Sequence, residues 1–123
     1  MKKILFFSLF FLLFVSNNSC KKESSFKLSK IITENPTLIS ATSVISGGNI
    51  TDDGGSPVTA RGVCWGTSHN PTLSDSKTID GNGAGSFNSL ITGLEIMTPY
   101  YFRAYATNEM GTSYGNETTL TTP

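Results

Sequence analysis

The sequence has few of the residues that build reactive sites. Its 123 residues include two cysteines, one histidine and one tryptophan. Nucleophilic catalysis requires a nucleophile, a base and an orienting group within reach of one another. The single histidine, His69, lies in a polar stretch beside Asn70 and Pro71. We therefore predict that the protein is not an enzyme, that His69 is an exposed turn residue, and that no cofactor is bound.

An excess of charge of either sign is also missing. The chain has nine Lys or Arg residues and nine Asp or Glu residues. Without its first nineteen residues, which hold Lys2 and Lys3, seven basic side chains stand against nine acidic ones, a net charge of about −2. A nucleic-acid partner requires a basic patch that displaces phosphate counterions. The balance of charge therefore argues against nucleic acid as a partner.

Long hydrophobic runs are limited to one. Residues 4–15 are apolar except for Ser8, follow Lys2 and Lys3, and contain five of the eight phenylalanines. About a dozen residues are too few for a helix to cross roughly 30 Å of hydrocarbon, but they fit the core of a signal peptide. We predict that residues 1–19 are a cleaved signal peptide.

The sequence around Cys20 resembles the lipobox of bacterial lipoproteins, because Cys20 follows the apolar run after Val-Ser-Asn-Asn-Ser. The resemblance implies that Cys20 is acylated, with palmitate or a related chain, and becomes the first mature residue. Lipoproteins of this kind carry more than one acyl chain, as stable anchoring requires. Lys21 after the cysteine favours the outer membrane by the same resemblance. Ordinary secretion with an unmodified Cys20 remains the alternative.

A short tether is expected between this cysteine and the folded domain. Residues 20–35 are largely polar, although residues 27–33 are a candidate edge strand. Pro36 biases Asn35 toward an extended conformation. We therefore place the start of the domain at residue 36 and its end at residue 123.

Beyond Pro36 the sequence predicts short strands separated by turns. It is rich in Thr, Ser, Val and Ile and has no apolar stripe of helical period. Gly, Asn, Asp and Pro recur at intervals where turns are expected. The intervening segments are predicted strands at residues 38–40, 42–50, 58–66, 76–79, 86–92, 99–107 and 112–121. Seven such strands predict an all-β, antiparallel sandwich without a regular helix.

Two groups of residues in this region form a recognisable pattern: residues 62–66, Gly-Val-Cys-Trp-Gly, and Leu94, Ile96, Thr98, Tyr100, Asn108 and Gly111. Together they resemble a fibronectin type III domain, in the version found in short bacterial surface lipoproteins. The resemblance implies an immunoglobulin-like sandwich with a tyrosine corner, in which Tyr100 buries its ring and its hydroxyl bonds to an upstream backbone group.

The predicted core follows from alternation along the strands. We expect Cys64 to be a buried, reduced thiol that packs as a small hydrophobic group. The expected core residues are Val44, Ile50, Val63, Trp65, Phe87, Leu90, Leu94, Tyr100, Phe102 and Ala104.

Two groups of polar or glycine residues are candidate sites. The aspartates Asp52, Asp53, Asp75 and Asp80 lack the spacing of a calcium loop, so no metal site is predicted. Residues 81–85, Gly-Asn-Gly-Ala-Gly, lack the lysine and the following helix of a phosphate-binding loop. A hairpin turn explains this stretch better.

The candidate ligand-binding residues are Tyr101, Arg103 and Tyr105. If Tyr100 and Phe102 face inward, these three line the solvent side of the same strand. Aromatic rings beside a guanidinium suit a protein or glycan ligand, although cross-strand packing alone would also explain them. We therefore expect a non-enzymatic, lipid-anchored surface protein for adhesion, spacing or protein binding. The alternative is a carbohydrate-binding accessory of a glycan-uptake system that uses Tyr101, Tyr105 and Trp65.

Overall fold

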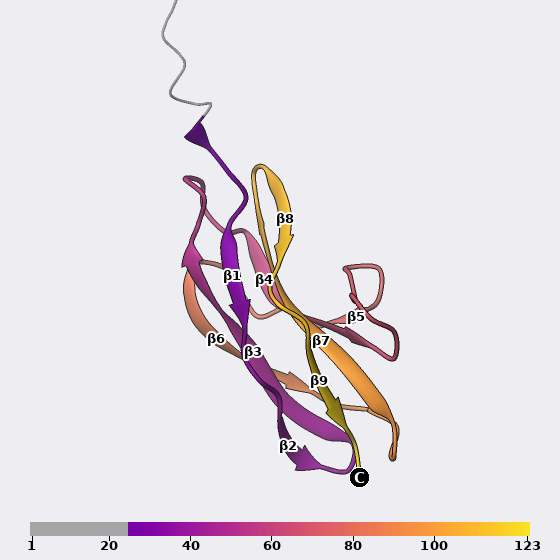
Figure 1. The fold of residues 1–123 in the computed structure, drawn as a ribbon. Coiled ribbons are helices and arrows are strands. Elements are labelled where there is room, and N and C mark those ends of the chain that lie inside the picture. The colour runs from indigo at the N-terminus through magenta and orange to yellow at the C-terminus, as the bar shows by residue number, and fades with distance from the viewer. Residues whose placement is uncertain (1–24) are drawn as a thin grey trace, which may run out of the picture.

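The computed structural model describes residues 25–123, which form two packed antiparallel sheets without an α-helix in that range (Figure 1). The first sheet contains β1 (Lys30–Thr33), β2 (Thr37–Ser40), β3 (Ser43–Asp52) and β6 (Gly85–Ile91). The second contains β4 (Ala60–Gly66), β5 (Ser76–Lys77), β7 (Pro99–Asn108), β8 (Gly111–Tyr114) and β9 (Thr118–Thr121). The predicted all-β sandwich is confirmed. No helix within this range is long and apolar enough to cross a bilayer.

Each sheet is built around one ten-residue strand. In the first sheet, β3 pairs with β6 along one side. Along its other side, the first half of β3 pairs with β2 and the second half pairs with β1. In the second sheet, β7 lies between β4 and the successive strands β8 and β9, and β5 extends the far side of β4. The predicted last strand, residues 112–121, is therefore two strands that share the same edge of β7.

The sandwich begins upstream of the predicted boundary at residue 36. β1 pairs with β3, as expected for an edge strand. Further upstream, the Lys27 amide donates to the Gly54 carbonyl over 2.7 Å, and the Asn108 side chain donates to the Lys27 carbonyl over the same distance. Residues 27–33 therefore belong to the folded domain rather than to the predicted tether.

The core between the sheets contains nearly all of the predicted residues. Phe102, Val44, Val63 and Ala104 are fully buried, and Trp65 packs against the same cluster while half-buried. Others in the cluster are Ile50, Val58, Phe87, Ile91, Leu94, Tyr100 and Ala106.

Leu90 is the exception, because its side chain is 59% exposed. Side chains two apart share a strand face, and Phe87 points inward, so Ser89 and Ile91 follow it into the core. Leu90 lies three residues from Phe87 and must face outward, beside Ile45 on β3. The prediction of Leu90 as a core residue was wrong because it broke this alternation.

Tyr100 forms the expected tyrosine corner. Its ring is buried, and its hydroxyl accepts a hydrogen bond from the Glu95 amide over 2.8 Å. Thr122 fixes the same turn, since its hydroxyl donates to the Glu95 carbonyl over 2.6 Å and accepts from the Thr98 amide over 2.9 Å. Residues 92–98 are thus held against the end of β7.

Thr33 joins the two sheets on one lateral side of the sandwich. Its buried hydroxyl accepts from the Ala104 amide of β7 over 2.9 Å, at the gap between β8 and β9. Its own amide donates to the Asn116 side chain, also over 2.9 Å. The break between β8 and β9 would otherwise leave the Ala104 amide without an acceptor. Thr33 supplies that acceptor and connects the two sheets on this side.

Replacing Tyr100 with Phe should destabilise the domain by about 1–3 kcal/mol, because the Glu95 amide loses the acceptor that the buried Tyr100 side chain provides. Chemical denaturation of the two proteins measures the difference. Tyr101→Phe is the matched control, since its hydroxyl has no hydrogen-bond partner within residues 25–123, and it should change stability by less than about 0.5 kcal/mol. Equal midpoints for Tyr100→Phe and wild type would contradict the corner.

Candidate functional site

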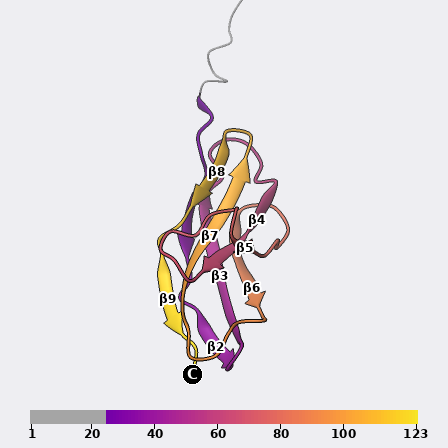
Figure 2. The ribbon, with the colours of Figure 1, turned by 90° about the vertical axis from the view of Figure 1, so that its right-hand side faces the viewer.

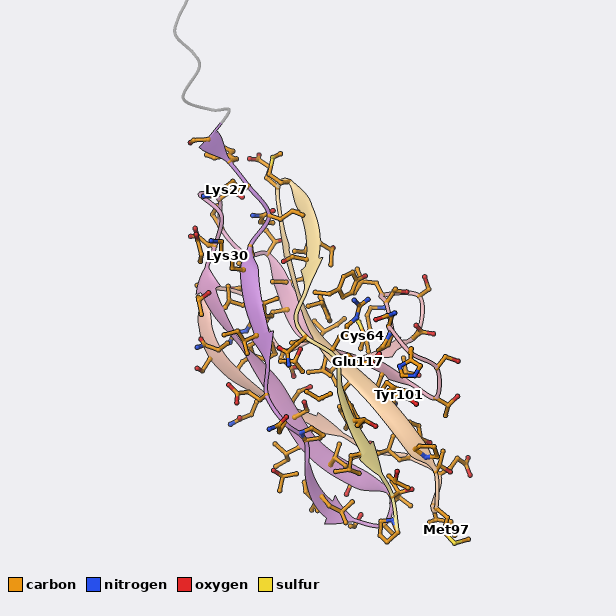
Figure 3. All side chains as sticks on the ribbon, in the orientation of Figure 1. Lys27, Lys30, Cys64, Met97, Tyr101 and Glu117 are labelled. Carbon is orange, nitrogen blue, oxygen red and sulfur yellow. The ribbon has the colours of Figure 1, made fainter. Side chains whose placement is uncertain are left out.

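The outer face of the second sheet carries the three candidate residues, and the protein's own loops cover most of it. The registers pair Tyr105 with Gly62, Arg103 with Cys64 and Tyr101 with Gly66 across β7 and β4. Figure 3 shows Tyr101, Cys64 and Glu117 gathered where the β4–β5 connection crosses this face. The three residues do lie on one strand face, but their surroundings differ.

Tyr105 is not available to a ligand. Its side chain is 2% exposed, and its hydroxyl donates to the Thr78 carbonyl over 2.7 Å. Residue 62 must be glycine for this arrangement, because a Cβ there would lie 2.2 Å from the Thr78 carbonyl oxygen. Burial raises the pKa of Tyr105 to about 12. The expectation that Tyr105 faces solvent was wrong because the chain after β5 passes directly over it.

Arg103 anchors the loop of residues 67–75. Its Nε and Nη2 atoms both donate to the Pro71 carbonyl, over 2.9 and 2.7 Å. The guanidinium carbon lies 4.3 Å from the centre of the Tyr114 ring, a cation–π geometry. The Tyr114 hydroxyl in turn accepts from the Leu73 amide over 3.1 Å. The planar donor expected to bind a ligand is therefore used to hold the loop.

Glu117 fastens the tip of the same loop. One carboxylate oxygen accepts from the Asn70 amide, and the other lies 2.8 Å from Nδ1 of His69. Asn70 adopts a left-handed backbone conformation, with a φ of 58° that asparagine tolerates better than most residues. The hydrogen bond from the Asn70 amide, followed by that from His69, lowers the pKa of Glu117. Because this glutamate lies 48 residues from His69, no local pattern could have revealed the contact.

Beneath the loop lies a second, smaller packed layer. The side chains of Cys64 and Pro71 are fully buried there, beside Tyr105. Burial raises the pKa of the Cys64 thiol to about 11, partly offset by the nearby Arg103 charge. The thiol is free and, with that pKa, protonated near neutral pH. The prediction of a buried thiol that packs as a hydrophobic group is confirmed.

Tyr101 and His69 are the accessible part of this face. Their ring centres are 4.2 Å apart, Tyr101 is half-buried, and the His69 side chain is 70% exposed, as predicted for a turn residue. Beside them, a Cβ at Gly66 would meet nothing within 4 Å. Residues 25–123 contain no pocket, so any partner of this face would meet a shallow surface.

The aspartates weighed as calcium ligands serve local turns instead. Asp52 and Asp53 accept from the amides of Gly54 and Gly55, each over 2.9 Å. Asp75 accepts from the Thr72 amide over 2.8 Å within the loop. In the described part of the chain, no three His, Cys, Asp or Glu side chains converge as metal ligands would.

Residues 81–85 form a turn, not a phosphate cradle. Gly81 and Gly83 have φ values of 89° and 92°, in the left-handed region that favours glycine. The strand β6 follows at once, so no helix terminus is present to bind an anion. Arg61 instead fixes the turn, donating to the Gly83 carbonyl over 3.0 Å.

The comparisons with known proteins define the fold and no narrower family. No family model and no curated protein sequence matches the chain. The solved structures it resembles include the sensor domain of the anti-sigma factor RsgI4 of Pseudobacteroides cellulosolvens, with 17% identity and a TM-score of 0.56 over 76% of this chain and 93% of that one. A myokine gives 17% identity and a TM-score of 0.57 over 79% and 99% of the two chains.

A third similar structure is the sixth fibronectin type III domain of human fibronectin type III domain containing protein 3. It shares 26% identity with a TM-score of 0.50 over 73% of this chain and 82% of that one. The chain is thus a fibronectin type III-like, immunoglobulin-like β-sandwich, as its resemblance implied. The predicted lipidation site, Cys20, and the predicted signal peptide, residues 1–19, lie outside the described residues.

Acid should open the loop of residues 67–75. Glu117 has a lowered pKa in the folded protein. The stability that its carboxylate gives the loop is therefore fully present above the unfolded pKa of about 4.3, and it is lost as the pH falls through the lower folded pKa. In a Cys20→Ala background, where Cys64 is the one remaining thiol, 4,4′-dithiodipyridine labelling should accelerate in that acid range.

The Glu117→Gln variant should label faster than its parent already at neutral pH and lose the acid-dependent acceleration. Glu95→Gln is the matched control, because this exposed carboxylate belongs to the turn of residues 92–98 and not to the loop of residues 67–75. Identical labelling of the Glu117→Gln variant and its parent at every pH would show that Glu117 does not hold the loop.

Proposed function

We propose that this protein is a non-enzymatic, lipid-anchored surface protein that displays one fibronectin type III-like module for adhesion, spacing or protein binding. The anchor is Cys20, and its acyl chains hold the module at the outer membrane. The observation that carries this proposal is the position at which the chain enters the sandwich, only seven residues after Cys20.

The entry point is fixed at one end of the molecule. Lys27 is bonded to Gly54 and Asn108 there. Met97 (Figure 3) and the C-terminus (Figure 1) lie at the opposite end. Seven residues span at most about 25 Å. An acylated Cys20 therefore keeps the Lys27 end close to the bilayer and directs the Met97 end away from it.

The membrane-distal end offers a surface for a protein partner. Ile96 and Met97 form part of the turn held by Tyr100, and their side chains are 53% and 75% exposed. Met97 has a φ of 51°, a left-handed backbone conformation that belongs to this turn. Apolar side chains on a fixed turn suit protein binding, because little conformational freedom is lost on contact.

The site geometry supports binding rather than turnover. Cys64 is covered and protonated, and His69 is engaged by Glu117 at Nδ1. The carbohydrate-binding alternative, which would use Tyr101, Tyr105 and Trp65, is less favoured, since Tyr105 is buried and the half-buried Trp65 packs against the core. Tyr101 with His69 remains as a small aromatic surface.

Palmitate labelling of cells that produce the full chain tests the anchor. Wild type should incorporate the label and fractionate with the outer membrane, and Cys20→Ala should lose both properties. Cys64→Ala is the matched control and should retain them, because the Cys64 side chain is buried. Label retained in Cys20→Ala, or unlabelled wild type in the soluble fraction, would contradict the proposal.

A further inference from the structure

Three of the four sheet edges in the described residues are interrupted. Along β1 and β2 the pairing with β3 shifts register twice, and Pro36 stands between the two strands. β5 has only two residues and includes Lys77. The opposite edge of the second sheet breaks between β8 and β9, where Thr33 inserts. Bulges, short strands, lysine and proline are the devices that prevent unwanted strand pairing.

The fourth edge, β6, has none of these devices. Its seven residues, Gly-Ser-Phe-Asn-Ser-Leu-Ile, contain no charge and no proline. Its register with β3 is unbroken from Val44 opposite Ile91 to Ile50 opposite Gly85. Within residues 25–123 it pairs with β3 alone, so its other side presents backbone donors and acceptors without a strand partner. Figures 1 and 2 both show β6 along the margin of the sandwich.

The side chains of β6 also suit pairing. Ser86, Asn88 and Leu90 point outward and are exposed, whereas Phe87, Ser89 and Ile91 are committed to the core. Leu90 lies beside Ile45, whose side chain is 40% exposed on the same outer face. An added strand would shield part of Leu90 from water and would complete the hydrogen bonds of the edge.

We propose that β6 pairs antiparallel with β6 of a second copy of this chain. The charge pattern favours this occupant, because the strand is neutral throughout and pairing it with itself brings no like charges together. A twofold axis through Asn88, the middle residue, pairs all seven residues and places Leu90 opposite Ser86 of the other copy. The two four-stranded sheets then form one continuous sheet, with both outer faces on the same side.

This arrangement reverses one copy relative to the other. The strands run along the length of the sandwich (Figure 1), so the Lys27 ends of the two copies emerge at opposite ends of the dimer. The ten residues of β7 alone extend about 33 Å, more than the roughly 25 Å that seven residues can span. If Cys20 is the anchor and the Met97 end points away from the bilayer, as the proposed function holds, both tethers cannot reach one membrane, and paired copies belong to two facing membranes.

Disulfide trapping tests the pairing without depending on the anchor. The full-length chain carrying Cys20→Ala and Asn88→Cys, in detergent micelles with a mild oxidant, should form disulfide-linked dimers, since directly opposed residues bring Cβ atoms to about 5 Å. The Cys20→Ala change, present in the control as well, prevents cross-linking through Cys20. Thr51→Cys is the matched control, because Thr51 is exposed on the same sheet face but lies on the central strand β3. It should remain monomeric.

A charge on the edge should abolish the association. Without oxidant, the protein mass of wild type should double with rising concentration in sedimentation, whereas Asn88→Lys should stay monomeric and Thr51→Lys should still dimerise. Unfolding midpoints check that each variant is folded. Wild type that remains a monomer up to roughly millimolar concentration, the level that tethering produces, would overturn the pairing. Equal trapping of Asn88→Cys and Thr51→Cys would do the same.

Vesicles test the consequence for membranes. Two vesicle populations carrying acylated wild-type protein should aggregate, and those carrying Asn88→Lys should remain dispersed. Dimers in micelles together with dispersed wild-type vesicles would overturn the facing-membrane arrangement while leaving the edge pairing established. Protein without an acyl chain would refute the proposed anchor and leave the micelle result unaffected, so the two failures are distinguishable.

Discussion

The structure depends on β7 being covered on both of its faces. Its inward side chains, Phe102 and Ala104 among them, fill the space between the sheets. Of its outward side chains, Arg103 lies under the loop of residues 67–75 and Tyr105 under the chain after β5. Its backbone pairs with β4, β8 and β9, and at the gap in that edge Ala104 bonds to Thr33. The described residues contain no disulfide, so the domain depends on buried surface for its stability. A strand covered on both faces adds to that stability, since each of its residues packs on one side or the other.

This double covering changes what the outer face can do. Arg103 and Tyr105 have the chemistry of a binding surface, yet both satisfy groups of the protein itself. Within residues 25–123, the exposed apolar turn at Met97 and the β6 edge, which pairs with β3 alone, lie elsewhere. Both positions are consistent with a module that binds other proteins through its end turn or its sheet edge. Neither position requires a pocket or a reactive side chain.

The sandwich and most of its core could be predicted because they follow from local rules. Alternation placed Val63 and Phe102 inside, and the corner residue Tyr100 was identifiable from its place between two apolar runs. The same rule, applied from Phe87, would have excluded Leu90. The exposure of Ile96 and Met97 was not anticipated, because turns carry no such periodicity.

The candidate site could be predicted only in part. The sequence identified which residues share the outer face of β7, but it did not identify what covers them. That depends on contacts between distant segments, such as Glu117 with His69 and Arg103 with Pro71. Residues 67–75 are polar and rich in turn formers, so their composition predicts an exposed loop rather than a covering layer.

Native-state hydrogen exchange tests most directly whether both faces of β7 are covered. The Ala104 amide, bonded to Thr33, should exchange only through global unfolding. The Asn70 and Leu73 amides, bonded to Glu117 and Tyr114, should be strongly protected although they lie in a surface loop. Exchange of Asn70 and Leu73 at the rates of an unstructured chain, beside a protected β7, would contradict the account.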